Sequence, residues 1–428
     1  MDALEGTHWD VIVSGTGLQQ SLLVLALSRS NKKILHVDRN DFYGGNEAAF
    51  SLQEARSWVI ERPSSYSLGA RAVEKPSGPD ESGASTKLGP SRAYSLSLAP
   101  HLIFTRSALL PILVSSKVHR QLEFLPVGSW WVFNRSPEDP SSSPTAGPKL
   151  TKIPSSREDV FASDAIEIRS KRALVKFLRF VAEYEAQADV WEPFASRPFT
   201  DFLVEHFKLP KDLHDPLLAL TLSLEHHSHT TTILALQRIA RHLRSMGVFG
   251  AGFGSLIPKW GGLSEIAQVA CRAGAVGGAV YILGTGVVRV ESDEKVGEQN
   301  DDGSSQSRAV RVGLGGGISV TADWIVGSRD DLPSRTTRGG LEDAATPGSS
   351  TSQSVSRAIF IVSSPLVPLF PPISEGSPRP AGAVVYFPSG SISTEESDQG
   401  SNAPPIYVFA HSSDTGECPS GQTMMTPN

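Results

Sequence analysis

The chain begins with a glycine-rich turn of the kind that binds dinucleotides. Gly15 and Gly17 follow an apolar segment over residues 9–13, and such a turn lets the backbone approach a pyrophosphate. Asp38 follows at about the distance, roughly 20 residues, at which this fingerprint places the acidic residue that binds ribose. The third glycine is replaced by Gln20, and a side chain there should crowd or cap the phosphate pocket. If Gln20 points sideways, a cofactor could still bind, and a lone glycine fingerprint is weak evidence.

Two other clusters carry groups that could do chemistry. His226, His227 and His229 are close in sequence, but side chains of adjacent residues point in different directions. Beyond Glu225 no acidic or cysteine partner stands at a helical spacing, so a metal site is not expected. Residues 252–255 lack the Gly-x-Ser-x-Gly order of a hydrolase nucleophile elbow. Nothing in these clusters predicts catalysis.

The elements that position the turn form a complete βαβ unit. Residues 9–13 are apolar and β-branched, as in a buried parallel strand. Residues 19–30 predict a helix whose apolar residues are too dense for a surface helix, so it should be covered on most sides. Residues 33–37 predict a second strand that ends at Asp38.

Composition limits the classes of protein that fit. The chain has 428 residues, 39% of them hydrophobic, which allows a large core in two structural domains. A net charge of −6 without a basic tract argues against nucleic-acid binding and against attraction to anionic lipid. No apolar run predicts membrane insertion or secretion. Cys271 and Cys418, the two cysteines, fit a reducing compartment, so we expect a cytoplasmic protein.

Five segments rich in Ser, Pro, Gly and acidic residues interrupt the ordered blocks. Such segments cannot bury enough apolar surface to offset chain entropy, and we expect disordered surface loops. Phosphorylation within them is an alternative, although tolerated insertions between strands are commoner. The segments are residues 74–91, 134–150, 292–307, 330–357 and 374–404.

The middle of the chain changes to a helical pattern. Apolar residues at three- and four-residue spacings predict helices over residues 164–187, 199–207, 213–224 and 232–246. Periodicity alone does not distinguish a simple bundle core from a bundle that opens to hold a lipid. The helix over residues 232–246 carries three arginines largely away from its apolar face, namely Arg238, Arg241 and Arg244, and such a side is usually only solvated.

Several blocks resemble one family. Residues 38–45, with the pattern Asp-Arg-Asn-x-x-Tyr-Gly-Gly, resemble the first block of the GDP dissociation inhibitor and Rab escort protein superfamily. Residues 15–20 resemble its escort-type version. Further similar stretches follow in the family's order at residues 94–100, 122–124, 153–161 and 260–272. The resemblance implies a flavoprotein-like α/β domain of the FAD/NAD(P)-binding type without flavin, over residues 1–158 and 248–428, and an inserted all-helical domain over residues 159–247.

The resemblance also implies which residues recognise a Rab GTPase. The family's binding positions fall on Tyr43 in the first block, on Glu265 and Arg272 in a predicted helix, and on Val280 and Ile282 in the following strand. The seven-residue spacing of Glu265 and Arg272 places both side chains on one helical face. An exposed acid, arginine and tyrosine suit a polar recognition patch with an aromatic anchor. At the last two positions this chain departs from the commoner family residues.

As an escort protein the chain would be non-catalytic and would need no cofactor. It would bind GDP-bound Rab, present it to the catalytic heterodimer of Rab geranylgeranyl transferase and deliver the lipidated product to membranes in transient contact. The helical domain would hold the geranylgeranyl lipid, whose burial contributes on the order of 10 kcal/mol of gross transfer energy. In such proteins the helical domain also docks the transferase, which gives Arg238, Arg241 and Arg244 a possible role.

Two alternatives stay open, one within the same family and one from another class of protein. A GDP dissociation inhibitor would recycle prenylated Rabs, but the insertions and residues 129–133 and 418–422 favour an escort. An FAD-dependent oxidoreductase is disfavoured by Gln20.

In the last third of the chain, strands are expected over residues 287–290, 310–313, 324–326, 358–362, 383–387 and 406–410. The last residues, 424–428, do not continue the family pattern, so we expect a shortened carboxyl terminus.

Overall fold

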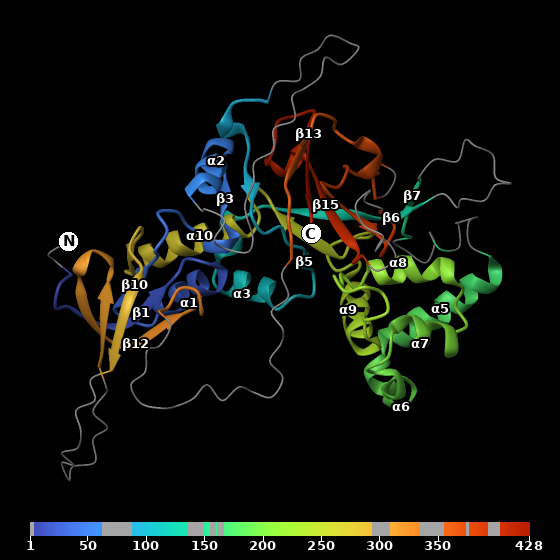
Figure 1. The fold of residues 1–428 in the computed structure, drawn as a ribbon, viewed down its shortest axis with the longest axis horizontal. Helices are drawn as coiled ribbons and strands as arrows, with labels where there is room; N and C mark the ends of the chain where they lie inside the picture. The colour runs from blue at the N-terminus through green and yellow to red at the C-terminus, as the bar shows by residue number, and fades with distance from the viewer. Residues whose placement is uncertain are drawn as a thin grey trace.

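The protein is described by a computed structural model that covers residues 4–61, 88–135, 149–154, 160, 167–292, 309–333, 355–373, 376–392 and 403–428. Figure 1 shows three parts. A six-stranded sheet with helices α1 and α10 lies at one end, and a group of helices from α5 to α9 lies at the other. A second, eight-stranded sheet stands between and above them.

The six-stranded sheet has the order β10-β11-β12-β1-β2-β9. Four neighbouring strands run parallel, and two antiparallel strands complete one edge. The strands are β1 (His8–Ser14), β2 (Ile34–Val37), β9 (Val280–Ile282), β10 (Val287–Ser292), β11 (Val310–Leu314) and β12 (Ser319–Gly327). The buried segments β1 and β2 are Val- and Ile-rich, as central parallel strands are. The predicted βαβ unit is therefore present.

Helices α1 (Leu18–Ser28) and α10 (Leu263–Val276) pack against each other at this sheet. Leu25 of α1 and Ile266 and Val269 of α10 share one apolar cluster. The two helices come close where α10 ends, since a β-carbon on Gly277 would lie 2.5 Å from the Ser28 hydroxyl. Glycine permits this approach because it has no side chain. The dense apolar pattern of the first helix thus reflects burial between the sheet and α10.

The eight-stranded sheet has the order β13-β16-β15-β14-β6-β8-β5, with β7 beside β6. Its pairs are antiparallel except β14 with β6. The strands are β5 (Ile103–Phe104), β6 (Phe124–Asn134), β7 (Lys149–Lys152), β8 (Ser255–Pro258), β13 (Phe360–Val362), β14 (Gly382–Phe387), β15 (Ile406–Ser412) and β16 (Thr423–Pro427). A short ribbon, β3 (Ala49–Phe50) with β4 (Leu96–Ser97), and helix α2 (Leu52–Glu61) lie between the two sheets in the chain, and helix α3 (Leu109–Ser115) joins β5 to β6.

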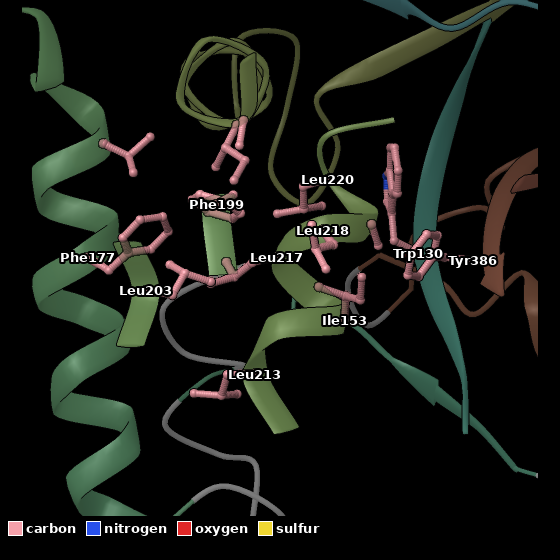
Figure 2. Close-up of a cluster of buried hydrophobic side chains, with 14 of the residues drawn as sticks. Trp130, Ile153, Phe177, Phe199, Leu203, Leu213, Leu217, Leu218, Leu220 and Tyr386 are labelled. Carbon is pink, nitrogen blue, oxygen red and sulfur yellow. The ribbon is translucent and has the colours of Figure 1, made fainter. Parts of the chain in front are cut away.

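The helical part packs on this second sheet. Its helices are α5 (Ile168–Ala182), α6 (Ala188–Trp191), α7 (Phe199–Glu205), α8 (His214–Ala219) and α9 (Thr232–Ser245). In Figure 2, Phe177 of α5 and Phe199 of α7 face a row of leucines that continues to Trp130 and Tyr386 of the sheet. One core therefore runs from the helices into the sheet.

Two expectations about the later chain need correction. The strand expected over residues 383–387 is confirmed as β14, a buried central strand, so the loop expected over residues 374–404 is wrong for residues 382–387. The helix predicted over residues 213–224 is the short α8, because the chain turns after Leu220 with Leu222 at positive φ. Most of the other predicted insertions lie outside the described residues, as do residues 164–166 of the first predicted helix.

Candidate functional site

The glycine-rich turn between β1 and α1 is covered by side chains of the chain itself. Gly15 has φ +90°, and a β-carbon there would collide with the Asp331 carboxylate. Gln20 Nε2 donates to Asp331 Oδ2 at 3.3 Å, and Gln20 Oε1 lies 3.0 Å from the position that a β-carbon on Gly17 would take. Gln20 thus folds over the turn and holds a carboxylate there.

A second carboxylate occupies the start of α1. Glu47 Oε2 accepts a hydrogen bond from Leu18 N at 2.6 Å. In the dinucleotide fingerprint the pyrophosphate binds at this helix terminus, because the first backbone N–H groups have no partner within the helix. A bound pyrophosphate would have to displace Glu47 and approach Asp331. No sequence signal predicts these two contacts, since neither residue belongs to the fingerprint.

Asp38 does not face an open ribose site. Its Oδ2 accepts from Thr16 N at 2.7 Å and from Thr16 Oγ1 at 2.6 Å. Its Oδ1 accepts from Asn40 N and Asn40 Nδ2 at 2.8 and 2.9 Å. The side chain is buried, with 1% exposure. The residue at the ribose-binding position therefore holds the turn and the loop after β2.

His36 joins the same turn to an aromatic cluster. Its Nε2 lies 2.6 Å from Gly15 O, and its ring centroid lies 4.9 Å from that of Tyr281. Burial lowers the pKa of His36 below its ordinary value, which favours the neutral ring. Tyr281 in turn contacts Tyr43 edge-on, with centroids 6.5 Å apart.

The residues assigned to Rab recognition lie around this cluster, on three elements. Tyr43 lies in the loop after β2 and is half-buried. Glu265 and Arg272 lie on α10; Arg272 is exposed, whereas Glu265 is half-buried. Burial raises the pKa of Glu265, and Arg272 partly opposes this effect. The expectation that all three side chains are exposed is therefore wrong for Tyr43 and Glu265, which the loop and the helix partly cover.

The other two assigned residues lie on an edge strand. Val280 and Ile282 belong to β9, which pairs in parallel with β2 at one edge of the sheet. Val280 is exposed and Ile282 is half-buried. The Ile282 carbonyl accepts from Asp38 N at 2.9 Å, so β9 is tied to the start of the Tyr43 loop.

The three arginines of α9 are exposed but differ in their contacts. Arg238 Nη1 donates to the carbonyls of Thr221 and Leu222 at 3.1 and 2.9 Å. Arg244 pairs with Glu185 at 2.5 Å and also donates to a backbone carbonyl of α5. Only Arg241 makes no such contact with the part of the chain that is described. Arg238 and Arg244 therefore tie α9 to neighbouring segments of the helical part.

The described residues of the helical part pack around an aromatic core. Phe177, Phe180, Phe202 and Phe207 contact one another with ring centroids 5.2–5.8 Å apart. Where this part meets the second sheet, a cavity of about 20 Å³ lies beside His242. That volume suits about one water molecule and not a chain of about twenty carbons.

Two absences concern the described residues alone. Among them, no helix is long and apolar enough to cross a membrane. Within the same ranges, no three His, Cys, Asp or Glu side chains are grouped as metal ligands would be. His226 is instead close to Ser228, with Nδ1 and Oγ 2.7 Å apart.

Comparisons of sequence give one family. The family model described as GDP dissociation inhibitor matches residues 5–312. Rab proteins geranylgeranyltransferase component A of Saccharomyces cerevisiae is 33% identical over 293 residues, covering 68% of this chain and 46% of that protein. Rab escort protein 1 of Arabidopsis thaliana is 25% identical over 332 residues, covering 69% and 57%. The chain spans about half the length of these relatives.

Comparisons of structure agree with this result at the level of the fold. The Rab GDI of Plasmodium falciparum has a TM-score of 0.64 at 21% identity, covering 99% of this chain and 82% of that one. An oxidoreductase of Methanosarcina mazei has a TM-score of 0.59 at 13% identity, covering 98% and 78%. These likenesses confirm the predicted flavoprotein-like α/β fold with a helical part.

Proposed function

Because the chain belongs to the GDP dissociation inhibitor family, we propose that it acts as a Rab escort protein. It binds GDP-bound Rab GTPases, presents them to the catalytic heterodimer of Rab geranylgeranyl transferase, and carries the lipidated Rab to membranes. The 33% identity with the yeast protein named component A of that transferase carries this proposal. The proposed location is the cytoplasm, with transient membrane contact during delivery.

The proposed role is non-catalytic and uses no flavin. The first support is the pair of carboxylates, Glu47 and Asp331, at the place where a pyrophosphate would bind. Negative side chains there repel a second anion and already satisfy the Leu18 N–H. The second support is the engagement of Asp38 with Thr16 and Asn40. The purified chain should be colourless, and stoichiometric flavin absorbance that survives gel filtration would overturn this part.

The proposed Rab-binding surface consists of Tyr43, Glu265, Arg272, Val280 and Ile282. It combines an exposed arginine, a half-buried carboxylate and an aromatic ring on rigid elements, which suits a polar interface with aromatic anchors. The transferase is proposed to dock on the exposed side of α9, with Arg241, which pairs with no charge among the described residues, as the docking cation. The geranylgeranyl lipid is proposed to enter the helical part after its core opens.

A reconstituted prenylation assay tests the proposal directly. Unprenylated Rab, the catalytic heterodimer and labelled geranylgeranyl diphosphate are combined with and without this chain, and label on Rab is measured. Transfer that depends on the chain is expected. A chain that extracts prenylated Rab from membranes but supports no transfer would indicate the second candidate, a Rab GDP dissociation inhibitor. The Plasmodium Rab GDI, which has a similar fold, is the reason to include this candidate. A chain that binds no Rab would overturn both.

A further inference from the structure

We propose that the residues left from the dinucleotide fingerprint now position Tyr43 for its partner. This inference rests on the proposed function, because it concerns the same Rab-binding surface. It assigns a positioning role to Thr16 and Asp38, which lie beneath the surface and touch no partner. Both are buried, with 1% exposure each.

The first step is a relay of hydrogen bonds through the Thr16 hydroxyl. Thr16 Oγ1 accepts from Gly44 N at 3.0 Å and donates to Asp38 Oδ2 at 2.6 Å. The Gly44 N–H belongs to the peptide group that joins Tyr43 to Gly44. The relay therefore fixes the backbone directly after Tyr43 to the glycine-rich turn.

The local backbone reinforces this placement. Gly44 has φ +97°, a conformation that glycine adopts at little cost. A β-carbon on Gly44 would lie 3.1 Å from Ala48 Cα, so the loop folds back closely on itself. Beyond this fold, Glu47 bonds to Leu18 N at the start of α1. The loop is thus anchored at Gly44 to the turn and at Glu47 to the start of α1.

A second set of bonds connects the loop to the edge strand. Asp38 N donates to Ile282 O at 2.9 Å, and Asp38 O accepts from Thr285 N at 2.7 Å. The Tyr281 ring supports the Tyr43 ring from the same strand. Tyr43 and the proposed contacts on β9 consequently share one buried polar scaffold.

The functional consequence follows from preorganisation. A side chain that is fixed before binding loses less conformational freedom when the partner arrives. Without the Thr16 hydroxyl, the Gly44 N–H would be buried without a partner, and the loop would relax to hydrate it. Tyr43 would then reach its binding position in only a fraction of molecules, and the affinity for Rab would fall by that fraction.

The test compares Thr16→Val, which removes the hydroxyl at nearly constant shape, with Thr16→Ser, which keeps it. Binding of the full chain to unprenylated, GDP-bound Rab is measured by calorimetric titration. Thr16→Val should weaken binding about tenfold, as expected for a lost buried hydrogen bond. Thr16→Ser should stay within about twofold. Ser129→Ala, which removes a buried hydroxyl bonded to Leu369 O in the other sheet, controls for general loss of stability and should bind as the unmutated chain does.

A double-mutant cycle decides whether Thr16 acts through Tyr43. In a Tyr43→Ala background, Thr16→Val should add less than about a twofold loss, because the side chain that it positions is gone. Hydrogen exchange of the unbound chain provides a readout without Rab: the Gly44 amide should exchange faster in Thr16→Val and not in Thr16→Ser. Additive losses in the cycle, or unchanged exchange at Gly44, would overturn the positioning role. If the unmutated chain binds no Rab, the proposed function fails and this inference with it.

Discussion

The Tyr43 loop and helix α9 both present side chains to a proposed partner, but different forces hold them. Buried polar groups fix the loop, through Thr16, Asp38 and Glu47. An apolar face fixes α9, where Leu236 and Ile239 have no exposed surface. Directed hydrogen bonds specify one geometry, whereas apolar packing tolerates repacking as long as volume is kept. The first region therefore suits recognition of one surface, and the second suits the opening of the helical part that is proposed for lipid binding.

The largest expected effect removes the packing that holds the second region. Phe202 is fully buried among Phe180, Phe194 and Phe207. Phe202→Ala should lower the free energy of unfolding of the helical part by about 3–5 kcal/mol, through lost burial and a cavity. Denaturant unfolding measures this change.

If the two regions are held separately, the Phe202→Ala chain should still bind unprenylated Rab within about twofold. Val204→Ala, on the same helix but 44% exposed, is the matched control and should change stability by less than about 0.5 kcal/mol. A loss of Rab binding that parallels the loss of stability would contradict the comparison, since it would mean that the loop depends on the helical core.

A second expected effect is a pH dependence at the junction between α9 and the second sheet. His242 is buried, with its ring edge-on to Trp130 at 5.2 Å, and burial lowers the pKa of His242 to about 4. An unfolded histidine has a pKa near 6.5, so the unfolded chain takes up the proton first as pH falls. Stability from the neutral ring is present above about pH 6.5 and is lost between about pH 6.5 and 4, by about 3 kcal/mol.

The check is unfolding of the unmutated chain and of His242→Phe at several pH values. The variant lacks the titrating group. Between about pH 6.5 and 4 its free energy of unfolding should therefore fall by about 3 kcal/mol less than that of the unmutated chain. Other histidines with lowered pKa, among them His36 and His214, titrate in both chains, so the difference between the two chains isolates His242. If the free energy of unfolding falls equally with pH in both chains, His242 is hydrated at this junction.

The sequence predicted the first region better than the second. Gly15, Gly17 and Asp38 are close together along the chain and have fixed geometric roles, so the βαβ unit and its turn followed from local pattern. The contacts that fill the turn did not, because Asp331 is far from Gln20 in sequence. The strand over residues 383–387 followed from its apolar residues, whereas the loop predicted over residues 374–404 was too long, since low-complexity sequence surrounds β14.

For the helical part, periodicity identified α5 and α9 but could not say what their apolar faces contact. The same spacing suits a closed aromatic core and a lipid site. The roles of the arginines were equally undetermined. Arg238 and Arg244 bond to carbonyls and to Glu185, and such tertiary partners leave no mark in a local pattern.

A third, smaller effect tests the recognition surface itself. Arg272 is exposed on α10, so Arg272→Ala should leave the melting temperature within about 1–2 °C, as surface changes do. Affinity for unprenylated Rab should fall about tenfold through the lost charged contact. Gln268→Ala, another exposed residue of α10, is the control and should bind normally. Unchanged affinity of the Arg272 variant would remove this residue from the surface.

The smallest expected effect separates docking from structure on α9. Arg244 and Glu185 are each about half exposed, 43% and 52%, so solvent screens their pair and Arg244→Ala should cost less than about 1 kcal/mol of stability. Arg241→Ala should cost none that can be measured, because Arg241 contacts no described residue through its charge. Both variants are compared for stability by denaturant unfolding and for pull-down of the transferase heterodimer with Rab bound.

If Arg241 is the docking cation, Arg241→Glu should reduce complex formation by about fivefold or more, since a reversed charge sets like against like, while Rab binding survives. Arg244→Ala should then reduce complex formation only as far as it loosens α9 against α5. The opposite ranking, with Arg244 decisive and Arg241 neutral, would show that docking depends on how α9 is held and not on its free charge. In that case the contrast between a region fixed by directed bonds and one fixed by apolar packing would no longer hold.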